Sequence, residues 1–318
     1  MTYETLIYTT DGPIATITLN RPDKFNTIRP PMWDEIEAAL GQANRDIDVR
    51  VIVLQGAGHS FCAGFDFSDN LKQYNVGGLN MDPEKWDPGY DMIFATNPYL
   101  GPIPKFMSIW RSSKPVIAKV QGWCVGGGSE MALCADFVVA AGGARFGTPY
   151  ARVWGCHLTG MWIYRLGLTK AKRYALTGDW VSGKEAAEID LINESCPADQ
   201  LDARTRYWAE RMAKMPGTQL AAMKLIVNQA FDNMGLQSTQ TLGPILDGLM
   251  RNTTEGRAFV RTAMDHGVQR AVTERDGPAV NVELLVGGAQ LALHAEDLGR
   301  EGLVDLEEVD VVHGEARL

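Results

Sequence analysis

The first 56 residues alternate between strand and helix patterns in an order that restricts the possible folds. Residues 5–19 predict two short strands separated at Asp11-Gly12, because ATITLN alternates apolar and polar side chains as a half-buried strand does. A helical pattern follows over residues 31–44, and RVIVLQG (50–56) is a β-branched run typical of a buried strand. A strand, a helix and a second strand in this order indicate a βαβ unit and therefore a parallel sheet.

Two more strands are expected in the middle of the chain. KPVIAKVQGW (114–123) and DFVVAA (136–141) have the apolar composition of buried strands, and a glycine-rich turn with a helix separates them. The turn at Gly64 is expected to begin a further helix, with Asp66 near its first turn. The sequence therefore predicts an α/β fold.

Residues 75–104 are the least regular part of the chain. They contain several aromatic residues, and five prolines lie between Pro83 and Pro104. A loop of this length inside a compact domain is usually a lid, a binding loop or a disordered insert.

Helical periodicity replaces the strand patterns after about Gly167. No Ser/Gly-rich linker marks the change, so we expect a strand-rich part over residues 1–200 and a helical part over residues 201–276. Residues 277–318 form an acidic extension whose apolar run VELLVGGAQLALHA predicts either a helix or a partly ordered tail. The helical segments are KAKRYALTG, KEAAEIDLI, LDARTRYWAERMAKM, TQLAAMKLIVNQAFDNM and EGRAFVRTAMDHGVQRAV.

Charge and cysteine usage exclude several classes of protein. The net charge of −9, with no basic patch, argues against a nucleic-acid partner, because nothing is present to neutralise phosphates. The five cysteines are scattered and form no CxxC pair, so neither a disulfide framework nor a zinc site is indicated. We expect a cytoplasmic protein that is neither exported nor inserted in a membrane, because no run approaches the roughly 18 apolar residues of a span.

The stretch GWCVGGGSEMALCAD (122–136) is the strongest candidate for a functional motif. It lacks the GK[ST] of a phosphate-binding P-loop, and Met131 stands where the dinucleotide fingerprint needs a glycine. Two interpretations remain. In the first, the glycines allow close backbone approach, and Glu130 complements the helix dipole. In the second, their N–H groups form half of an oxyanion hole, with the Glu130 carboxylate one helical turn away, which suits proton transfer beside a carbonyl.

The glycine turn FCAGFD (61–66) can supply the second N–H of such a hole. With it, the chain resembles the crotonase (enoyl-CoA hydratase/isomerase) superfamily over roughly residues 5–275. That resemblance implies a crotonase-like spiral of ββα units followed by a C-terminal helical region, assembled as a homotrimer or hexamer through residues 201–275. The motifs that carry it are LNRPDKFNTI, FCAGFD, KPVIAKVQGWCVGGGSEMALCAD, ARFGTP and TGDWVSGKEAAEIDLINE.

The resemblance also implies roles for individual residues. Phe65 and Gly127 match the two N–H donors that hold the thioester carbonyl of an acyl-CoA, and Glu130 matches the first catalytic carboxylate. The positions that match the coenzyme A contacts of the family are equally compatible with ordinary turn formation; they are Asp23, Lys24, Phe25, Ala63 and Asp66.

The second catalytic glutamate of the family is missing. Hydratases of this family carry it in an FGxPE stretch, but here the stretch reads FGTPYARVWGCHLTG, so the position falls on Tyr150 or Ala151. A tyrosine, with a reference pKa of about 10, is neutral at pH 7 and can donate a hydrogen bond or act as an acid. His157 titrates in the range of a general base, although a single histidine is more often structural. We expect Arg152 to pair with a carboxylate.

The resemblance therefore implies an enzyme acting on an acyl-CoA thioester, either an enoyl-CoA hydratase or an enoyl-CoA isomerase, in fatty acid or aromatic acid metabolism. It implies no metal and no cofactor other than the coenzyme A of the substrate. A hydrolase, a decarboxylase or a non-catalytic acyl-CoA-binding protein that lacks the second carboxylate are the alternatives. The insert at 75–104 lies where the acyl pocket is covered in the family, so we expect it to determine substrate choice. Asp190 replaces a family glycine, which affects only a helix terminus.

Overall fold

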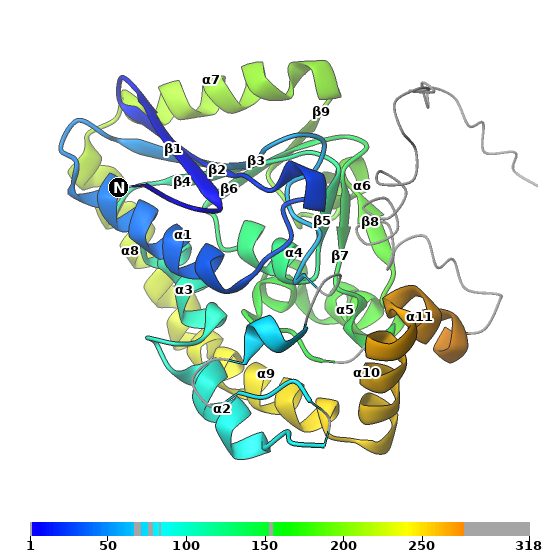
Figure 1. Ribbon diagram of the computed structural model, residues 1–318. Helices are drawn as coiled ribbons and strands as arrows, with labels where there is room; N and C mark the ends of the chain where they lie inside the picture. The colour runs from blue at the N-terminus through cyan, green and yellow to red at the C-terminus, as the bar shows by residue number, and fades with distance from the viewer. Residues whose placement is uncertain (1, 67–70, 76–78, 83, 153–154, 277–318) are drawn as a thin grey trace, which may run out of the picture.

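A six-stranded sheet in the order β1-β2-β3-β4-β6-β9 forms the centre of the computed structural model (Figure 1). The structure describes residues 2–66, 71–75, 79–82, 84–152 and 155–276. The strands of this sheet are β1 (Leu6–Asp11), β2 (Ile14–Leu19), β3 (Val51–Gly56), β4 (Val116–Val120), β6 (Phe137–Ala141) and β9 (Glu194–Cys196). The shorter strands β5 (Trp123–Val125), β7 (Arg145–Gly147) and β8 (Trp180–Ser182) form a second sheet in the order β5-β7-β8.

The predicted parallel sheet is confirmed. Strands β1 and β2 form an antiparallel hairpin, and every later pair in the large sheet, from β2-β3 to β6-β9, is parallel. The helix predicted over residues 31–44 is α1 (Pro30–Arg45), which makes the crossover from β2 to β3. Gly122, at φ +55°, turns the chain from β4 into β5, so that successive segments contribute strands to the two sheets in turn. This is the spiral of ββα units that the sequence motifs predict.

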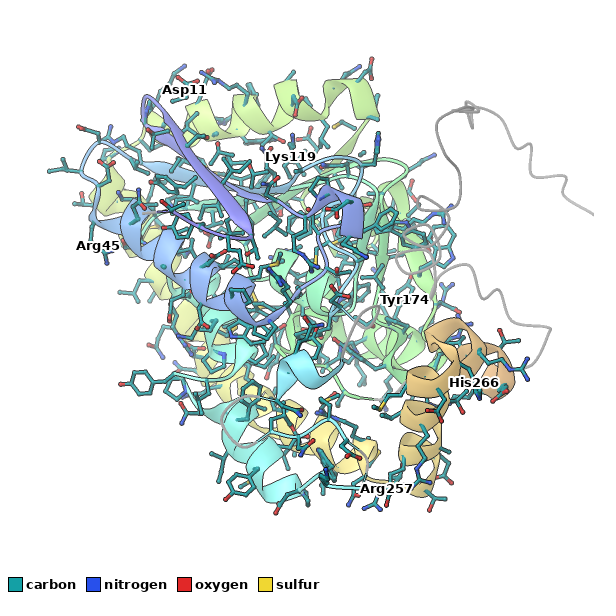
Figure 2. All side chains as sticks on the ribbon, viewed as in Figure 1. Asp11, Arg45, Lys119, Tyr174, Arg257 and His266 are labelled. Atoms are coloured by element: carbon teal, nitrogen blue, oxygen red, sulfur yellow. The ribbon has the colours of Figure 1, made fainter. Side chains whose placement is uncertain are left out.

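Helices cover both faces of the large sheet. Figure 1 shows α7 (Leu201–Ala213) on one face and α1 on the opposite side. Leu201, Ala209 and Ala213 of α7 pack against β-branched residues of the sheet. On the α7 side, Lys119 of β4 pairs with Asp202 at 2.5 Å (Figure 2). The expected boundary at residue 200 is therefore a change of secondary structure, while the packing continues across it.

Helix α6 (Gly183–Glu188) lies beside β8 and β9, and most of the other helices lie on the α1 side or at the far end of the molecule from α7 (Figure 1). Short 3-10 segments occur at Pro22–Lys24, Leu71–Tyr74, Pro149–Arg152 and Ala198–Gln200. The α-helices not yet given are α2 (Pro88–Thr96), α3 (Pro102–Arg111), α4 (Gly127–Ala132), α5 (Met161–Thr177), α8 (Gly217–Asn233), α9 (Leu236–Arg251), α10 (Thr254–His266) and α11 (Val268–Asp276).

The prediction of an irregular insert at residues 75–104 is wrong for much of that segment. Pro88 and Pro102 each occupy the first position of a helix, α2 and α3. A proline is favoured there because its missing N–H would have no partner within the helix. The side chain of Asp87 also caps α2 by accepting from the N–H groups of its first turn. The prolines that look like helix breakers in the sequence therefore begin two helices.

The prediction that a helix begins at Gly64 is also wrong for residues 64–66, which the structure describes. Phe65 instead forms a parallel β-bridge with Ile28, and the next helical segment described is the 3-10 turn Leu71–Tyr74. The sequence patterns also missed β8, β9 and the 16-residue helix α9, which contains Pro244. The predicted tail at 277–318 lies outside the described residues.

Asp190 ends the α6 region in the left-handed conformation at φ +65°. A glycine adopts this conformation without a steric penalty, and aspartate is one of the few other residues that tolerate it. The replacement is thus confined to a helix terminus, as expected. In the described part of the chain, no helix is both long and apolar enough to cross a membrane.

Candidate active site

Two glycine turns meet at the start of α4. The N–H of Cys62 donates to the carbonyl oxygen of Trp123 at 2.9 Å, and the N–H of Val125 donates to the carbonyl oxygen of Cys62 at 3.1 Å. Gly64, at φ +96°, faces the second turn: a Cβ there would lie 3.1 Å from the carbonyl oxygen of Val125 and 3.8 Å from the nitrogen of Gly127. The structure therefore brings the FCAGFD and GGGSE motifs together.

At each of the three consecutive glycines a different steric constraint excludes a side chain. Gly126 has φ +52°, which side chains rarely adopt. A Cβ on Gly127 would lie 2.8 Å from the ring of Phe65, and one on Gly128 would overlap the carbonyl oxygen of Cys62. The first interpretation of this stretch, close backbone approach, is confirmed. It is also compatible with the second, because the approach sets the two predicted N–H donors beside each other.

The predicted oxyanion-hole donors, Phe65 and Gly127, remain available for a ligand. The bridge between Ile28 and Phe65 uses the carbonyl of Gly64 and the N–H of Asp66, at 2.8 and 2.9 Å. Among the backbone hydrogen bonds of the described residues, neither the Phe65 N–H nor the Gly127 N–H is a donor. Their role in holding a carbonyl oxygen stays a prediction that this geometry allows.

Glu130 is fully buried in α4, and protein donors surround its carboxylate. The Leu158 N–H donates to Oε1 at 3.1 Å, and Nδ1 of His157 lies 3.4 Å from the same oxygen. Thr159 donates to Oε2 through both its N–H, at 3.0 Å, and its hydroxyl. Burial by itself would raise the pKa of Glu130, but its bonds with His157 and Thr159 outweigh burial and lower the pKa below its usual value. The carboxylate is therefore ionised at neutral pH.

Tyr150 and His157 lie next to each other beside Glu130. Their rings meet edge to face, with centroids 5.7 Å apart. The buried Tyr150 hydroxyl makes no hydrogen bond of normal geometry among the described residues, but it lies close enough to the Glu130 carboxylate to interact with it. Burial first, and then the charges of Glu130 and Asp247, raise the pKa of Tyr150 well above its usual value. Tyr150 therefore keeps its proton at neutral pH and can donate a hydrogen bond; its role as an acid stays a prediction.

The two residues that follow Tyr150 have no contact with Glu130 among the interactions of the described residues. Ala151 is exposed, and the side chain of Arg152 lies against Gly178. The expected ion pair of Arg152 stays a prediction. Of the two positions that match the missing glutamate, Tyr150 is the one beside Glu130, and its role in place of that glutamate stays a prediction.

The residues predicted to contact coenzyme A lie on two turns that pack against each other. Asp23 is exposed and Lys24 is half-buried in the 3-10 turn that follows Arg21. Phe25 is held at φ +49°, and its carbonyl oxygen accepts from the N–H of Ala63 at 3.1 Å. The turn after β2 thus packs on the FCAGFD turn, which is the arrangement that a shared ligand would need.

Asp66 has a structural task that the sequence did not reveal. Its side chain is 1% exposed and pairs with Arg21 at 2.8 Å. Arg21 also donates to the carbonyl oxygen of Thr27 at 2.6 Å. The Asp66 carboxylate therefore braces one turn against the other, and its contact with coenzyme A stays a prediction.

Sequence reasoning missed the residues that hold the catalytic candidates. Thr159 and Leu158 follow the FGTP motif in HLTG, but nothing in that stretch indicated that they bind Glu130. Asp247, which acts on Tyr150, lies in a helix that the sequence patterns did not predict. Within the described ranges, no group of three or more His, Cys, Asp or Glu side chains could hold a metal ion.

Comparisons with known proteins agree with this geometry. The family model for enoyl-CoA hydratase/isomerase matches residues 9–242. A probable enoyl-CoA hydratase of Rhodobacter capsulatus is 30% identical over 271 residues, which cover 83% of this chain and 96% of that protein. A 1,2-epoxyphenylacetyl-CoA isomerase of Escherichia coli is 29% identical over 223 residues, covering 69% of this chain and 80% of that protein.

The fold comparison gives the same result. The crystal structure of an enoyl-CoA hydratase from Mycobacterium smegmatis matches with a TM-score of 0.78 and 40% sequence identity, covering 86% of this chain and 94% of that one. The sequence motifs, the meeting of the two glycine turns and the family match agree, and the chain belongs to the enoyl-CoA hydratase/isomerase family of the crotonase superfamily.

Proposed function

We propose that this protein catalyses proton transfer next to the thioester carbonyl of an enoyl-CoA, as an isomerase or a hydratase. One observation carries the proposal. Helix α4 is entirely buried and presents an ionised carboxylate at Glu130. Three residues earlier lies the Gly127 N–H, which donates to no backbone oxygen among the described residues. A donor for an oxygen and a base for a neighbouring carbon are thus held one helical turn apart.

In the proposed mechanism, the thioester oxygen accepts hydrogen bonds from the N–H groups of Phe65 and Gly127. When Glu130 removes a proton from the carbon next to the thioester carbonyl, negative charge develops on that oxygen. Preorganised donors at such a position stabilise the transition state by about 3 to 4 kcal/mol each. The bond from His157 is the longest that Glu130 accepts, so it is the one that an incoming proton replaces most easily.

The surroundings of Glu130 favour isomerisation over hydration. Its two oxygens already interact with two N–H groups, one hydroxyl and one imidazole, which fills the roughly four acceptor positions of a carboxylate. No second carboxylate among the described residues bonds to it and could share a water. Isomerisation delivers a proton to another carbon of the same substrate and needs no such water. Tyr150 is the proposed donor of that proton, and the proton taken up by Glu130 then passes to the tyrosinate oxygen, so that both groups return to their starting states. In a hydration, Glu130 would take its proton from the water instead, and the same transfer to Tyr150 would follow.

Coenzyme A is proposed to lie along the turn of Asp23, Lys24 and Phe25 and against Ala63, with no further cofactor. The close packing of Phe25 on Ala63 supports this placement. Fatty acid or aromatic acid metabolism is the proposed context. The five cysteines are free thiols, which supports a reducing compartment such as the cytoplasm.

We expect helix α8 to form the interface of a homotrimer or hexamer. None of its residues is buried, and even the apolar side chains of Leu225 and Ile226 are 68% and 63% exposed. One aromatic residue of α8, Phe231, packs against Trp110 and Tyr164, and polar contacts add to this: Lys224 pairs with Asp136 at 2.7 Å, and Asn228 donates to the carbonyl oxygen of Trp110 at 2.8 Å. A helix that leaves several other large apolar side chains exposed is typical of an assembly surface.

Two substrate series test the proposed reaction. Isomerisation of 3-enoyl-CoA thioesters increases the absorbance of the conjugated thioester, whereas hydration of 2-enoyl-CoA thioesters decreases it. We expect Glu130→Gln to lower kcat by about 10³-fold, within the usual range for loss of a general base. The exposed Glu210→Gln on α7 is the matched control and should retain full activity.

Three outcomes would contradict the proposal. Full activity of Glu130→Gln would show that Glu130 is not the catalytic base. Release of the free coenzyme A thiol would identify a thioester hydrolase. No turnover of any thioester, together with thermal stabilisation by acyl-CoA ligands, would indicate a binding protein.

A further inference from the structure

A buried ionic network joins helices α2 and α9, which lie side by side at the end of the molecule away from α7 (Figure 1). Arg251 of α9 pairs with Asp91 of α2 at 2.8 Å and with Asp247 of α9 at 2.9 Å. Asp91 is 2% exposed and also accepts from the indole N–H of Trp86 at 3.0 Å. A single guanidinium therefore fixes the Asp247 carboxylate relative to both helices.

The Asp247 carboxylate reaches the loop that carries the catalytic candidates. Gly155, at φ +109°, lies between Asp247 and Tyr150: a Cβ on Gly155 would overlap Oδ1 of Asp247 and lie 3.3 Å from the Tyr150 ring. The backbone of Cys156 also forms a hydrogen bond with Asp247. The carboxylate and the phenol ring thus both lie against the same glycine.

Helix α9 also supports Glu130, two helical turns before Asp247. The side-chain amide of Gln240 donates to the carbonyl oxygen of Thr159 at 3.2 Å, and Thr159 in turn holds the Glu130 carboxylate. Residues seven apart on a helix lie on the same face. One face of α9 therefore contacts the supports of both the proposed base and the proposed acid.

We propose that Asp247 is a positioning residue for Tyr150, and that helix α9 sets the distance between this proton donor and Glu130. The inference rests on the proposed function, because it assigns Tyr150 to that proton transfer. A purely structural ion network is the alternative, since many buried ion pairs contribute only to packing. Besides its pair with Arg251, Asp247 lies against Gly155 beside the Tyr150 ring. A purely structural network does not require that contact, so it favours the positioning role.

The charges around Tyr150 determine how the inference can be tested. Glu130 faces Tyr150 from α4, Asp247 faces it from α9, and Cys156 and His157 face it from its own loop. Removing the negative charge of Asp247 leaves one charge fewer opposing ionisation of the phenol. Asp247→Asn should therefore ionise Tyr150 at lower pH and move the alkaline limb of the rate profile to lower pH.

The experiment compares Asp247→Asn with Asp265→Asn, an exposed position on α10. We expect Asp247→Asn to lower kcat about tenfold at pH 7.5 with little change in KM, since misplacing a catalytic group by a small distance has effects of this order. The ionisation of Tyr150 is followed directly as tyrosinate absorbance, with Tyr150→Phe as the reference. Asp247→Glu keeps the charge but displaces the carboxylate, so it should lower kcat without moving the alkaline limb.

Several results would overturn the inference. If the tyrosinate titration is unchanged in Asp247→Asn, the inference is wrong, and this holds for any reaction that the enzyme catalyses. If Tm falls while the pH–rate profile stays unchanged, Asp247 has a structural role only. Full activity of Tyr150→Phe, with Glu130→Gln inactive, would remove this inference and leave the proposed function. If Asp247→Asn does not fold, Arg251→Gln replaces it; loss of the guanidinium frees Asp247, and an unchanged kcat in that variant would equally overturn the inference.

Discussion

Thr159 donates twice to one oxygen of Glu130, from its backbone N–H and from its side-chain hydroxyl. The two donors come from one residue, so the orientation of the carboxylate follows the position of the loop that precedes α5. Burial disfavours an ionised Glu130, and these donors together with His157 reverse that effect. The ionised state of the proposed base therefore depends on a residue outside the glycine motif.

We expect Thr159→Val to move the acid limb of the kcat/KM profile to higher pH. A hydrogen bond to the charged form lowers the pKa of Glu130, so loss of the hydroxyl raises that pKa, and protonation removes the base at a higher pH. A pH series of kcat/KM measures the shift. Thr159→Ser keeps the hydroxyl and is the control; an unmoved acid limb in Thr159→Val would contradict the assignment of Glu130 as base.

The same substitution should lower stability in a pH-dependent way. The folded-state pKa of Glu130 is depressed, so its contribution to stability is complete above the unfolded value of about 4.5 and is lost as the pH falls through the folded value. At pH 7 we expect Thr159→Val to reduce the free energy of unfolding by about 1.5 to 3 kcal/mol, the range for hydrogen bonds to charged groups. Urea unfolding at several pH values tests this; a loss that is as large in acid as at pH 7 would not fit.

Gly128→Ala should destabilise the protein by about 3 kcal/mol and abolish activity. The added methyl group would overlap the carbonyl oxygen of Cys62, and only a backbone shift could relieve the overlap. That shift would separate the N–H groups of Phe65 and Gly127. Gly143→Ala is the matched control, because a Cβ there meets no atom within 4 Å. Thermal unfolding and kcat measure both effects, and an active, stable Gly128→Ala variant would disprove the close approach.

Asp66→Ala should reduce the free energy of unfolding by about 3 to 5 kcal/mol. Removing one partner of a buried pair leaves the other charge uncompensated, and Asp66 is 1% exposed while Arg21 is 14% exposed. Asp23→Ala, on the exposed part of the neighbouring turn, should leave Tm unchanged and weaken coenzyme A binding. Calorimetric titration with coenzyme A separates the two roles; a stable Asp66→Ala variant would show that the pair is dispensable.

Leu225→Glu should convert the assembly to monomers. Leu225 is 68% exposed in α8, so the substitution does not disturb the interior of the chain, but it places a charge in the expected interface. Ile47→Glu is the control, since Ile47 is 93% exposed in the loop after α1. Light scattering after gel filtration gives the mass of each variant. An unchanged mass for Leu225→Glu would exclude α8 from the interface.

Local patterns predicted the centre of the fold because each strand and α1 carries its own periodicity. They failed at α2 and α3, where Pro88 and Pro102 occur at positions that only a helix N-terminus makes favourable. They also failed at α9, which contains Pro244 and yet packs against α2. In these helices, packing against distant segments decides between helix and loop. The local sequence pattern does not show which distant segments will be in contact.

The active-site motifs were predictable for a related reason. The glycines of α4 follow β5 directly, and Gly64 lies two residues after Cys62, which forms a β-bridge with Cys124 of β5. The partners of Glu130 and Tyr150 could not be found in this way. Thr159 approaches after a loop, and Asp247 approaches from a helix nearly 100 residues beyond Tyr150.

Helix α4 is six residues long and entirely buried. The spacing of the Gly127 and Glu130 backbones along it is fixed by the helical conformation rather than by the side chains that surround it. Side chains of α3 such as Ile103, which lines a neighbouring cavity, can therefore be altered by mutation or by protein engineering without changing this backbone spacing. A new acyl specificity can be selected in such a scaffold independently of the proton-transfer step.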